Sequence, residues 1–354
     1  MLAVEGADSA TRGQMYNRSA SLPAAVRRPP SWGRLLAPRY WPTWAGLGVL
    51  RLLSLLPFRL KLAIGAALGA LLRRLPLRYV RIARRNIELC LPELGAAARS
   101  RLLNRHFVSL GISLLEIAAA WWCPTARLRK ISRLEGLEHL REALARGRGA
   151  ILLTAHFTPL EIGGRILAAA TPVNIIYRPS KNEALSYVLG RGRSRNGGHA
   201  IPRDDIRAMI TALKNNECVW YAPDQSYRKK GAQMVSLFGI PAATNTATSR
   251  IARMTGCAVL PFFVERLPGT AGYRAVIQPA LAEFPSACPR ADAERFHRFI
   301  EEQVRAVPDQ YLWIHRRFKG LTAADPDYYG RDPPKLARGD LLTAPPPSAA
   351  SPAA

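Results

Sequence analysis

A histidine and a glutamate five positions apart are the first residues of the chain whose types and spacing could do chemistry. An apolar run, residues 151–155, ends on His156, and Glu161 follows shortly after Pro159. A run of this kind is typical of a buried strand, so the histidine stands directly after a strand. If the next helix begins near Pro159, a residue that favours the first helical position, the Glu161 carboxylate can reach an imidazole nitrogen. The spacing then predicts a general base, His156, oriented by Glu161.

The same residues match a second pattern, the capping box of a helix N-terminus. In "TPLE", Thr158 is the N-cap and Glu161 stands three positions later. In this interpretation Glu161 serves its own helix, and His156 is an ordinary loop residue. Spacing alone does not choose between the two interpretations.

Two further predicted strands end on polar residues. The segment "IIYR" ends on Arg178, and "CVWYAPDQ" ends on Asp224 and Gln225. A lone acid at a strand end is usually a cap or a turn former. Because the carboxyl ends of parallel strands meet at one edge of a sheet, we expect these side chains to share a pocket with His156.

A basic cluster lies next to aromatic residues in "YLWIHRRFKG", residues 311–320. Its charged members are Arg316, Arg317 and Lys319. One interpretation is a solvated basic surface. The other is a phosphate clamp, because arginine pairs with phosphate in a bidentate geometry.

Several kinds of site are missing from the sequence. It contains no GxxxxGK[ST] or GxSxG motif, no HExxH, and no GxGxxG after a predicted strand. The five cysteines are odd in number, widely spaced and without a CxxC pair, which argues against a zinc site and a disulfide framework. We therefore expect no metal and no cofactor, and a reducing compartment.

From residue 149 onward, short apolar runs alternate with amphipathic stretches. This alternation predicts an α/β fold with a mixed, largely parallel sheet flanked by helices, and function at the carboxyl ends of the strands. Residues 86–148 show helical periodicity, with one helix ending at "WWC" before Pro124. The predicted strands are 150–155, 173–177, 218–222, 258–264 and 273–277, and the predicted helices are 160–170, 182–195, 204–215, 245–256 and 290–306.

An apolar segment near the N-terminus predicts a membrane helix. Residues 40–57 contain a single charge, Arg51, and begin with aromatic residues of the type found at membrane interfaces. Roughly 20 apolar residues are needed to span a bilayer, so the segment either spans or lies in one leaflet. An amphipathic continuation contains a GxxxG-like pair, Gly65 and Gly69, which suits close helix packing. Six arginines within residues 73–85 then mark the cytoplasmic side.

The charge balance predicts an anionic partner. The chain carries 51 Lys and Arg against 25 Asp and Glu, a formal net charge of +26. Nucleic acid, an acidic protein and an anionic membrane all fit such a field. The predicted organisation is a disordered extension (1–37), membrane-anchoring helices (38–75), a catalytic domain (76–330) and a disordered Pro/Ala-rich tail (331–354).

Together these segments resemble a known enzyme family. The histidine–four residues–acid motif at a strand end is similar to that of glycerolipid-type acyltransferases, and the chain resembles more specifically the late acyltransferases of lipid A biosynthesis. The resemblance covers roughly residues 38–330 in family order. The matching segments are "PRYWPTWAGLGVL" (38–50), "IARRNIELCLPEL" (82–94), "GAILLTAHFTPLEIG" (149–163), "YRP" (177–179), "VWYAPDQSY" (219–227), "IARMTG" (251–256) and "QYLWIHRRFK" (310–319).

The resemblance implies transfer of a fatty acyl chain from acyl carrier protein to a hydroxyl of the Kdo-bearing lipid A precursor. It implies a location at the cytoplasmic face of the inner membrane of a Gram-negative bacterium. His156 and Glu161 would be the catalytic residues, without a covalent acyl-enzyme. We assign substrate binding to Arg178, Asp224, Gln225, Arg316, Arg317 and Lys319.

Two other functions fit parts of the sequence. An acyltransferase for another glycerophospholipid or glycolipid acceptor would share the histidine motif but lack "IARRNIELC" and "HRRFK". A non-enzymatic basic protein that binds nucleic acid or anionic lipid would explain the charge, but not three polar strand ends. The sequence does not specify the acyl chain length or the acceptor hydroxyl, and we expect no nucleic-acid partner.

Overall fold

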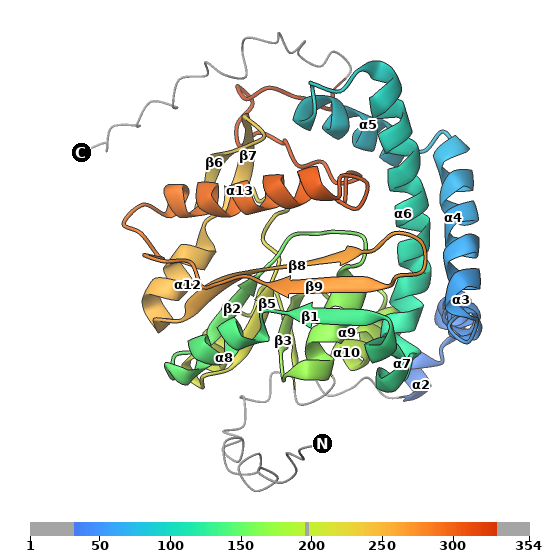
Figure 1. The fold of residues 1–354 in the computed structure, drawn as a ribbon, viewed down its shortest axis with the longest axis horizontal. Helices are drawn as coiled ribbons and strands as arrows, with labels where there is room; N and C mark the ends of the chain where they lie inside the picture. The colour runs from blue at the N-terminus through green and yellow to red at the C-terminus, as the bar shows by residue number, and fades with distance from the viewer. Residues whose placement is uncertain (1–31, 195–197, 331–354) are drawn as a thin grey trace, which may run out of the picture.

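A seven-stranded sheet forms the centre of the chain in the computed structural model, which describes residues 32–194 and 198–330 (Figure 1). The strand order is β1-β9-β8-β2-β5-β3-β4. Every neighbouring pair is parallel except β8 and β9, so the predicted mixed, largely parallel sheet is confirmed. The strands are β1 (Ser132–Glu135), β2 (Ala150–Leu153), β3 (Asn174–Tyr177), β4 (Ala200–Pro202), β5 (Cys218–Tyr221), β8 (Ala258–Arg266) and β9 (Tyr273–Ile277).

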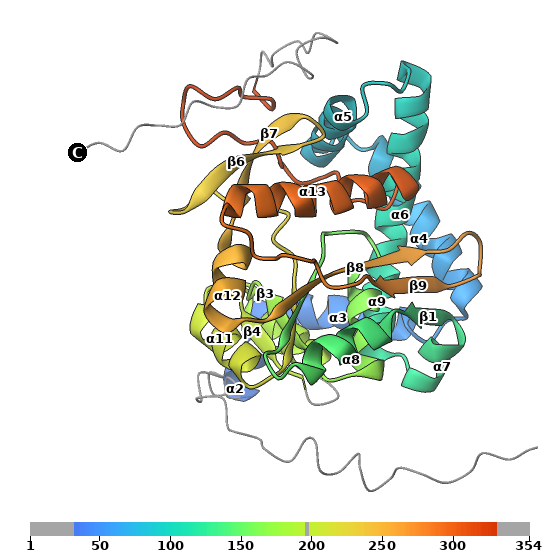
Figure 2. The ribbon, with the colours of Figure 1, turned by 60° about the vertical axis from the view of Figure 1, so that its left-hand side comes forward.

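Helices cover both faces of this sheet because its central strands are apolar on both sides. In β2, Ile151 and Leu153 enter one buried cluster while Ala150 and Leu152 enter the other. Figure 2 shows α13 along one face and α8 with α9 along the other. The helices of the domain are α5 (Arg78–Cys90), α6 (Ala96–Trp122), α7 (Thr125–Lys130), α8 (Leu137–Ala145), α9 (Leu160–Ala170), α10 (Glu183–Arg193), α11 (Ile206–Lys214), α12 (Ala247–Thr255) and α13 (Pro289–Ala306).

Most predicted elements lie where the periodicity placed them, including α9 and β9 at their predicted bounds. Four strands were not predicted, namely β1, β4, β6 (Ala232–Leu237) and β7 (Ile240–Asn245). β1 falls inside the stretch expected to be helical, and it is a four-residue strand at the edge of the sheet. β6 and β7 form a separate antiparallel hairpin. Its two turn residues, Phe238 and Gly239, both have positive φ, and phenylalanine is not a residue that signals such a turn.

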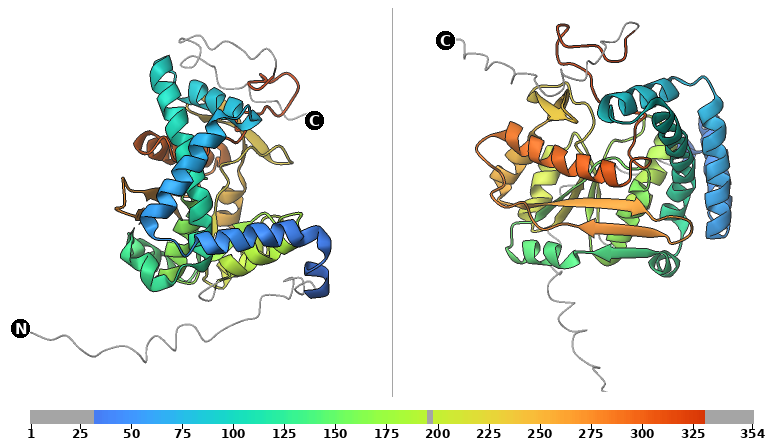
Figure 3. Two further views of the ribbon diagram at one scale, coloured as in Figure 1. Left: turned by 90° about the vertical axis from the view of Figure 1, so that its right-hand side faces the viewer. Right: turned by 45° about the horizontal axis from the view of Figure 1, so that its top comes forward.

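The predicted N-terminal membrane segment forms two helices rather than one. The apolar segment is divided into α3 (Trp41–Leu53) and α4 (Phe58–Arg74), which meet at a steep angle (Figure 3). Thirteen residues of α3 measure about 20 Å, short of the about 30 Å of a bilayer core. In the described part of the chain the one helix long and apolar enough to span is α6, and 56% of its apolar window is buried inside the protein. A core helix of a soluble domain has the same properties.

The small-residue pair predicted to allow close packing does so between α4 and α6. A Cβ added at Gly69 would lie 2.0 Å from the carbonyl oxygen of Phe107, and one added at Gly111 would lie 2.2 Å from that of Gly65. The two backbones therefore touch at these glycines. This contact fixes α4 on the outside of α6.

The N-terminal helices expose many apolar side chains. Before α3 the described chain forms α2 (Trp32–Leu35) and a short 3-10 turn, with Leu35 fully buried beside Tyr40. The rest of the predicted disordered extension and the tail 331–354 lie outside the described residues. We call the following set the N-terminal apolar face: Trp32, Leu36, Trp41, Val49, Leu52, Leu55, Leu60, Leu71, Leu75 and Tyr79, all of them exposed.

Candidate active site

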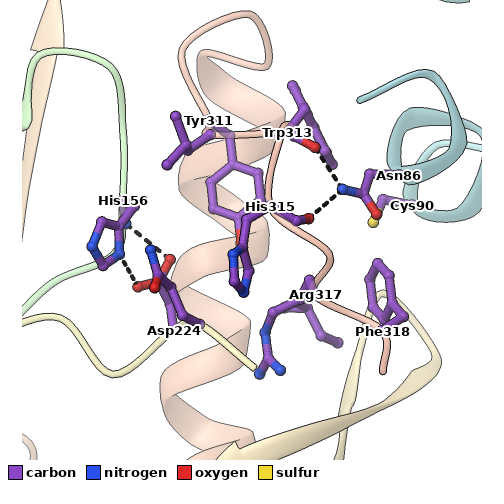
Figure 4. Close-up of a pocket in the computed structure, with 12 residues that line it drawn as sticks. Asn86, Cys90, His156, Asp224, Tyr311, Trp313, His315, Arg317 and Phe318 are labelled. Atoms are coloured by element: carbon purple, nitrogen blue, oxygen red, sulfur yellow. Dashed lines mark hydrogen bonds and ion pairs between the residues drawn. The ribbon is translucent and has the colours of Figure 1, made fainter. Parts of the chain in front are cut away.

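His156 and Asp224 form the centre of the site, at the carboxyl ends of the adjacent parallel strands β2 and β5. The Asp224 carboxylate accepts a hydrogen bond from the His156 backbone N–H at 2.9 Å, and its other oxygen lies 2.5 Å from Nδ1 of the imidazole (Figure 4). Because a carboxylate only accepts, Nδ1 carries a proton and Nε2 is left as the proton acceptor. Asp224 is buried, whereas 26% of the His156 side chain is exposed to incoming molecules.

Opposite charges set the protonation of this pair. Burial opposes the charged form of His156, but the charge and hydrogen bond of Asp224 outweigh it and raise the pKa of the imidazole. Burial likewise acts to raise the pKa of Asp224, but His156, through charge and hydrogen bonds, lowers it overall. The aspartate therefore stays ionised and stabilises the imidazolium that forms when Nε2 takes a proton.

Glu161 makes a different ion pair from the one expected. It is the second residue of α9, and its carboxylate pairs with the guanidinium of Arg193 at the end of α10. A weaker contact of 3.4 Å joins the same carboxylate to the indole N–H of Trp121. The carboxylate that holds the imidazole is thus Asp224, whereas the sequence suggested Glu161.

The capping-box interpretation is also wrong. Pro159, not Thr158, is the N-cap of α9, and no side chain caps this helix. The Thr158 hydroxyl lies 2.8 Å from the hydroxyl of Ser109, and its N–H donates to the carbonyl of Gln310. Thr158 therefore anchors the loop that carries His156 to α6 and to the segment around residue 310.

Arg193 is the functional candidate that sequence reasoning missed. Its guanidinium pairs with Glu161 and lies 5.8 Å from the ring centroid of Tyr177, the last residue of β3. Its positive charge acts to lower the pKa of His156, against the larger effect of Asp224. Nothing in the local sequence "GRGRSR" separates Arg193 from its neighbouring arginines, because only the tertiary fold brings it to Glu161.

The predicted substrate-binding residues divide into two groups. Gln225 lines the pocket beside His156 and Asp224, and Arg178 is exposed at the carboxyl end of β3. Arg316 and Lys319 are exposed as well. These four side chains are available to a ligand.

Arg317 is not available as a surface clamp. Only 3% of it is exposed, and its guanidinium donates to the carbonyl of Ala243, the hydroxyl of Thr244 and Nε2 of His297. It therefore attaches the C-terminal segment to β7 and α13. The predicted phosphate cluster is split, with Arg316 and Lys319 outside and Arg317 inside.

The pocket next to His156 is built mainly by the segment 311–318 and by α5. Figure 4 shows the His315 imidazole between Tyr311 and Arg317, on the side of Asp224. Cys90 is also a lining residue, but burial raises the pKa of its thiol well above its ordinary value, so it is a poor nucleophile. The lining residues are Asn86, Cys90, His156, Asp224, Gln225, Leu237, Tyr311, Leu312, Trp313, His315, Arg317 and Phe318.

The described residues contain no group of three His, Cys, Asp or Glu side chains placed to hold a metal ion. The acid–base pair His156–Asp224 and the ion pair Glu161–Arg193 instead stand at one edge of the sheet. A base oriented by a carboxylate, next to a cation, is suited to activating a hydroxyl and stabilising an oxyanion.

Comparison with known proteins agrees with this chemistry. A family model of bacterial lipid A biosynthesis acyltransferases matches residues 30–320. A lipid A biosynthesis palmitoleoyltransferase of Escherichia coli K12 is 38% identical over 295 residues, which cover 83% of this chain and 96% of that protein. A lauroyltransferase of the same organism is 37% identical over 296 residues, covering 83% and 97%. A myristoyltransferase is 25% identical over 284 residues, covering 80% and 88%.

Proposed function

Because the chain belongs to the bacterial lipid A biosynthesis acyltransferases, it is an O-acyltransferase that acts on a lipid A precursor, and we propose that His156 is its general base. The observation that carries the proposal is the contact between Nδ1 of His156 and the Asp224 carboxylate. That contact fixes the tautomer in which Nε2 can accept a proton. Asp224 is then the orienting acid, a role different from the substrate binding first assigned to it.

The proposed reaction moves an acyl group directly between two substrates. Nε2 of His156 removes the proton of an acceptor hydroxyl as the oxygen attacks the thioester carbonyl of acyl carrier protein. The tetrahedral intermediate collapses, the carbon–sulfur bond breaks, and the thiolate takes the proton from the imidazolium. A thiol with a pKa of about 8.5 is a good leaving group, so no enzyme nucleophile is needed.

We assign stabilisation of the oxyanion of that intermediate to Arg193. The backbone N–H of Leu160, at the start of α9, donates to the carbonyl of Phe157. Arg193 carries a full positive charge and is held by Glu161. We therefore assign Glu161 the role of positioning Arg193, in place of orienting His156.

The surface of the protein suits the proposed partners. Arg178, Arg316 and Lys319 are exposed cations that can meet the phosphates or sugar acids of the acceptor. Acyl carrier proteins are acidic, so the chain's charge of +26 also favours docking of the donor. The N-terminal apolar face fits insertion into one leaflet, at the cytoplasmic side of the inner membrane.

The test uses detergent-solubilised protein, acyl-loaded carrier protein and the Kdo-bearing precursor. The release of free thiol measures consumption of the donor, and mass spectrometry of the lipid measures acylation of the acceptor. We expect His156→Ala to lower kcat by about 10²–10⁴-fold with the fold intact. His139→Ala, a change on α8 outside the pocket, is the matched control and keeps wild-type activity. Near-normal transfer by His156→Ala would contradict the proposal.

A further inference from the structure

One irregular segment touches both halves of the proposed catalytic pair. Residues 310–318, which we call the strap, follow α13 and contain no helix or regular strand. The N–H of Leu312 donates to the carbonyl of His156 at 3.0 Å, and Tyr311 forms an isolated antiparallel bridge with Phe157. These contacts hold the loop after β2, which carries the base.

The strap holds the other loop through a side chain. The backbone N–H of Ser226, two residues after Asp224, donates to Nε2 of His315 at 3.1 Å. Burial lowers the pKa of His315 to about 4, so at neutral pH its Nε2 has a free lone pair for this bond. The histidine thus acts as an acceptor for the turn that carries the orienting acid.

Asn86 fixes the strap itself. This buried side chain of α5 donates from Nδ2 to the carbonyls of Trp313 at 2.6 Å and of His315 at 2.7 Å (Figure 4). Its Oδ1 accepts from the hydroxyl of Tyr329, which in turn accepts from the N–H of Phe318. One amide therefore binds the backbone on both sides of residue 314, including that of His315 itself.

We propose that Asn86 and His315 are positioning residues for the acid–base pair: Asn86 fixes the backbone of His315, and His315 fixes the turn that carries Asp224. The proposal rests on the function assigned above to His156 and Asp224. It gives a shared purpose to "IARRNIELC" and "QYLWIHRRFK", two segments far apart in the sequence that meet at this amide. A purely structural role of Asn86, satisfying two buried carbonyls, is the alternative.

Substitutions at His315 separate the two roles, because this residue is only partly buried. His315→Leu removes the acceptor for Ser226, and His315→Gln keeps one in a similar place. We expect the Leu variant to lose about tenfold in kcat, the effect of losing one hydrogen bond to the turn that carries Asp224. KM for the acceptor should stay unchanged. The Gln variant should stay within about threefold of wild type. Equal losses in both variants would overturn the proposal.

A double-mutant cycle tests whether Asn86 acts through His315. If it does, Asn86→Ala and His315→Leu together lose no more kcat than His315→Leu alone. Multiplied losses in the double variant would show independent roles and overturn the proposed route. His139→Ala, a change on α8 that touches neither the strap nor the pocket, is the control. It should change kcat by less than about threefold. If Asn86→Ala does not fold, the His315 pair decides alone.

A readout independent of turnover separates failure of this proposal from failure of the proposed function. NMR titration of the His156 imidazole should show a lower pKa in His315→Leu than in wild type, because a displaced Asp224 no longer favours the imidazolium. The Ser226 amide should exchange faster with solvent in the same variant. An unchanged titration and unchanged exchange overturn the positioning role. Absence of acyl transfer by the wild-type protein overturns the proposed function and leaves this titration valid.

Discussion

Two pairs of oppositely charged side chains, His156–Asp224 and Glu161–Arg193, lie at the same edge of the sheet. They differ in the secondary structure that positions them. His156 and Asp224 sit on loops after two hydrogen-bonded strands, and Asp224 makes a second hydrogen bond to the histidine backbone. Glu161 and Arg193 belong to two helices, α9 and α10, and both side chains are about one-fifth exposed. The first pair is therefore fixed by the sheet, while the second depends on how two helices pack. We expect the first to set the protonation of the base and the second to place a cation.

Breaking the strand-held pair should have the largest effect. Asp224→Asn keeps the shape of the side chain but can present an N–H to Nδ1, which favours the wrong tautomer of His156. We expect kcat to fall by on the order of 10³-fold. The measurement is the rate of thiol release with saturating acceptor.

The same variant should change the pH dependence in a defined direction. Asp224 raises the pKa of His156, whereas burial lowers it. Without the carboxylate, burial dominates, so the pKa falls and the base stays neutral to lower pH. The acidic limb of log(kcat/KM) should therefore move to lower pH in Asp224→Asn. A move to higher pH would contradict the role of Asp224.

Breaking the helix-held pair should have a smaller effect. Glu161→Gln removes the charge that holds Arg193 but leaves an acceptor for its guanidinium. We expect a loss of about 10–100-fold in kcat, since one oxyanion donor is commonly worth this much or more. Arg193→Met should lose at least as much, and the double variant should lose no more than Arg193→Met alone. Independent, multiplied losses would show that Glu161 acts on His156 directly.

These two pairs also show what the sequence could and could not predict. The strand-end position of His156 and Asp224 follows from apolar runs and parallel strand order, so their shared pocket was predictable. Their direct contact was not, because 68 residues separate them and no local spacing reports it. Glu161 was chosen as the partner because it is near in sequence, although α9 directs it toward Arg193. The main helices and strands were predictable from the same pattern of apolar residues. The strand β1 and the β6–β7 hairpin were not, because their sequences lack a periodic or turn signal.

The buried Arg317 and the exposed Arg316 of the basic cluster should differ in their contribution to stability. Arg317→Met would leave Nε2 of His297 without its donor and remove the contact to the Thr244 hydroxyl, while the carbonyl of Ala243 would keep only the N–H of Tyr227. We expect the free energy of unfolding to fall by about 2–4 kcal/mol, measured by denaturant titration. The matched control is the exposed neighbour Arg316: Arg316→Met should change the free energy of unfolding by less than about 0.5 kcal/mol.

Substituting the exposed cations of that cluster should change only KM for the acceptor, and this should be the smallest of the effects on activity. Arg316 and Lys319 are exposed, and the Arg316 guanidinium lies 5.7 Å from the ring centroid of Tyr329. In an Arg316→Gln/Lys319→Gln variant we expect KM for the phosphorylated precursor to rise about three- to tenfold, with kcat unchanged, since two solvent-screened contacts are lost. The increase should shrink as salt is added, because salt already weakens the wild-type contacts. A dephosphorylated acceptor should show no difference between variant and wild type. If it shows the same increase, these cations do not bind phosphate, and the basic surface serves the acidic carrier protein or the membrane instead.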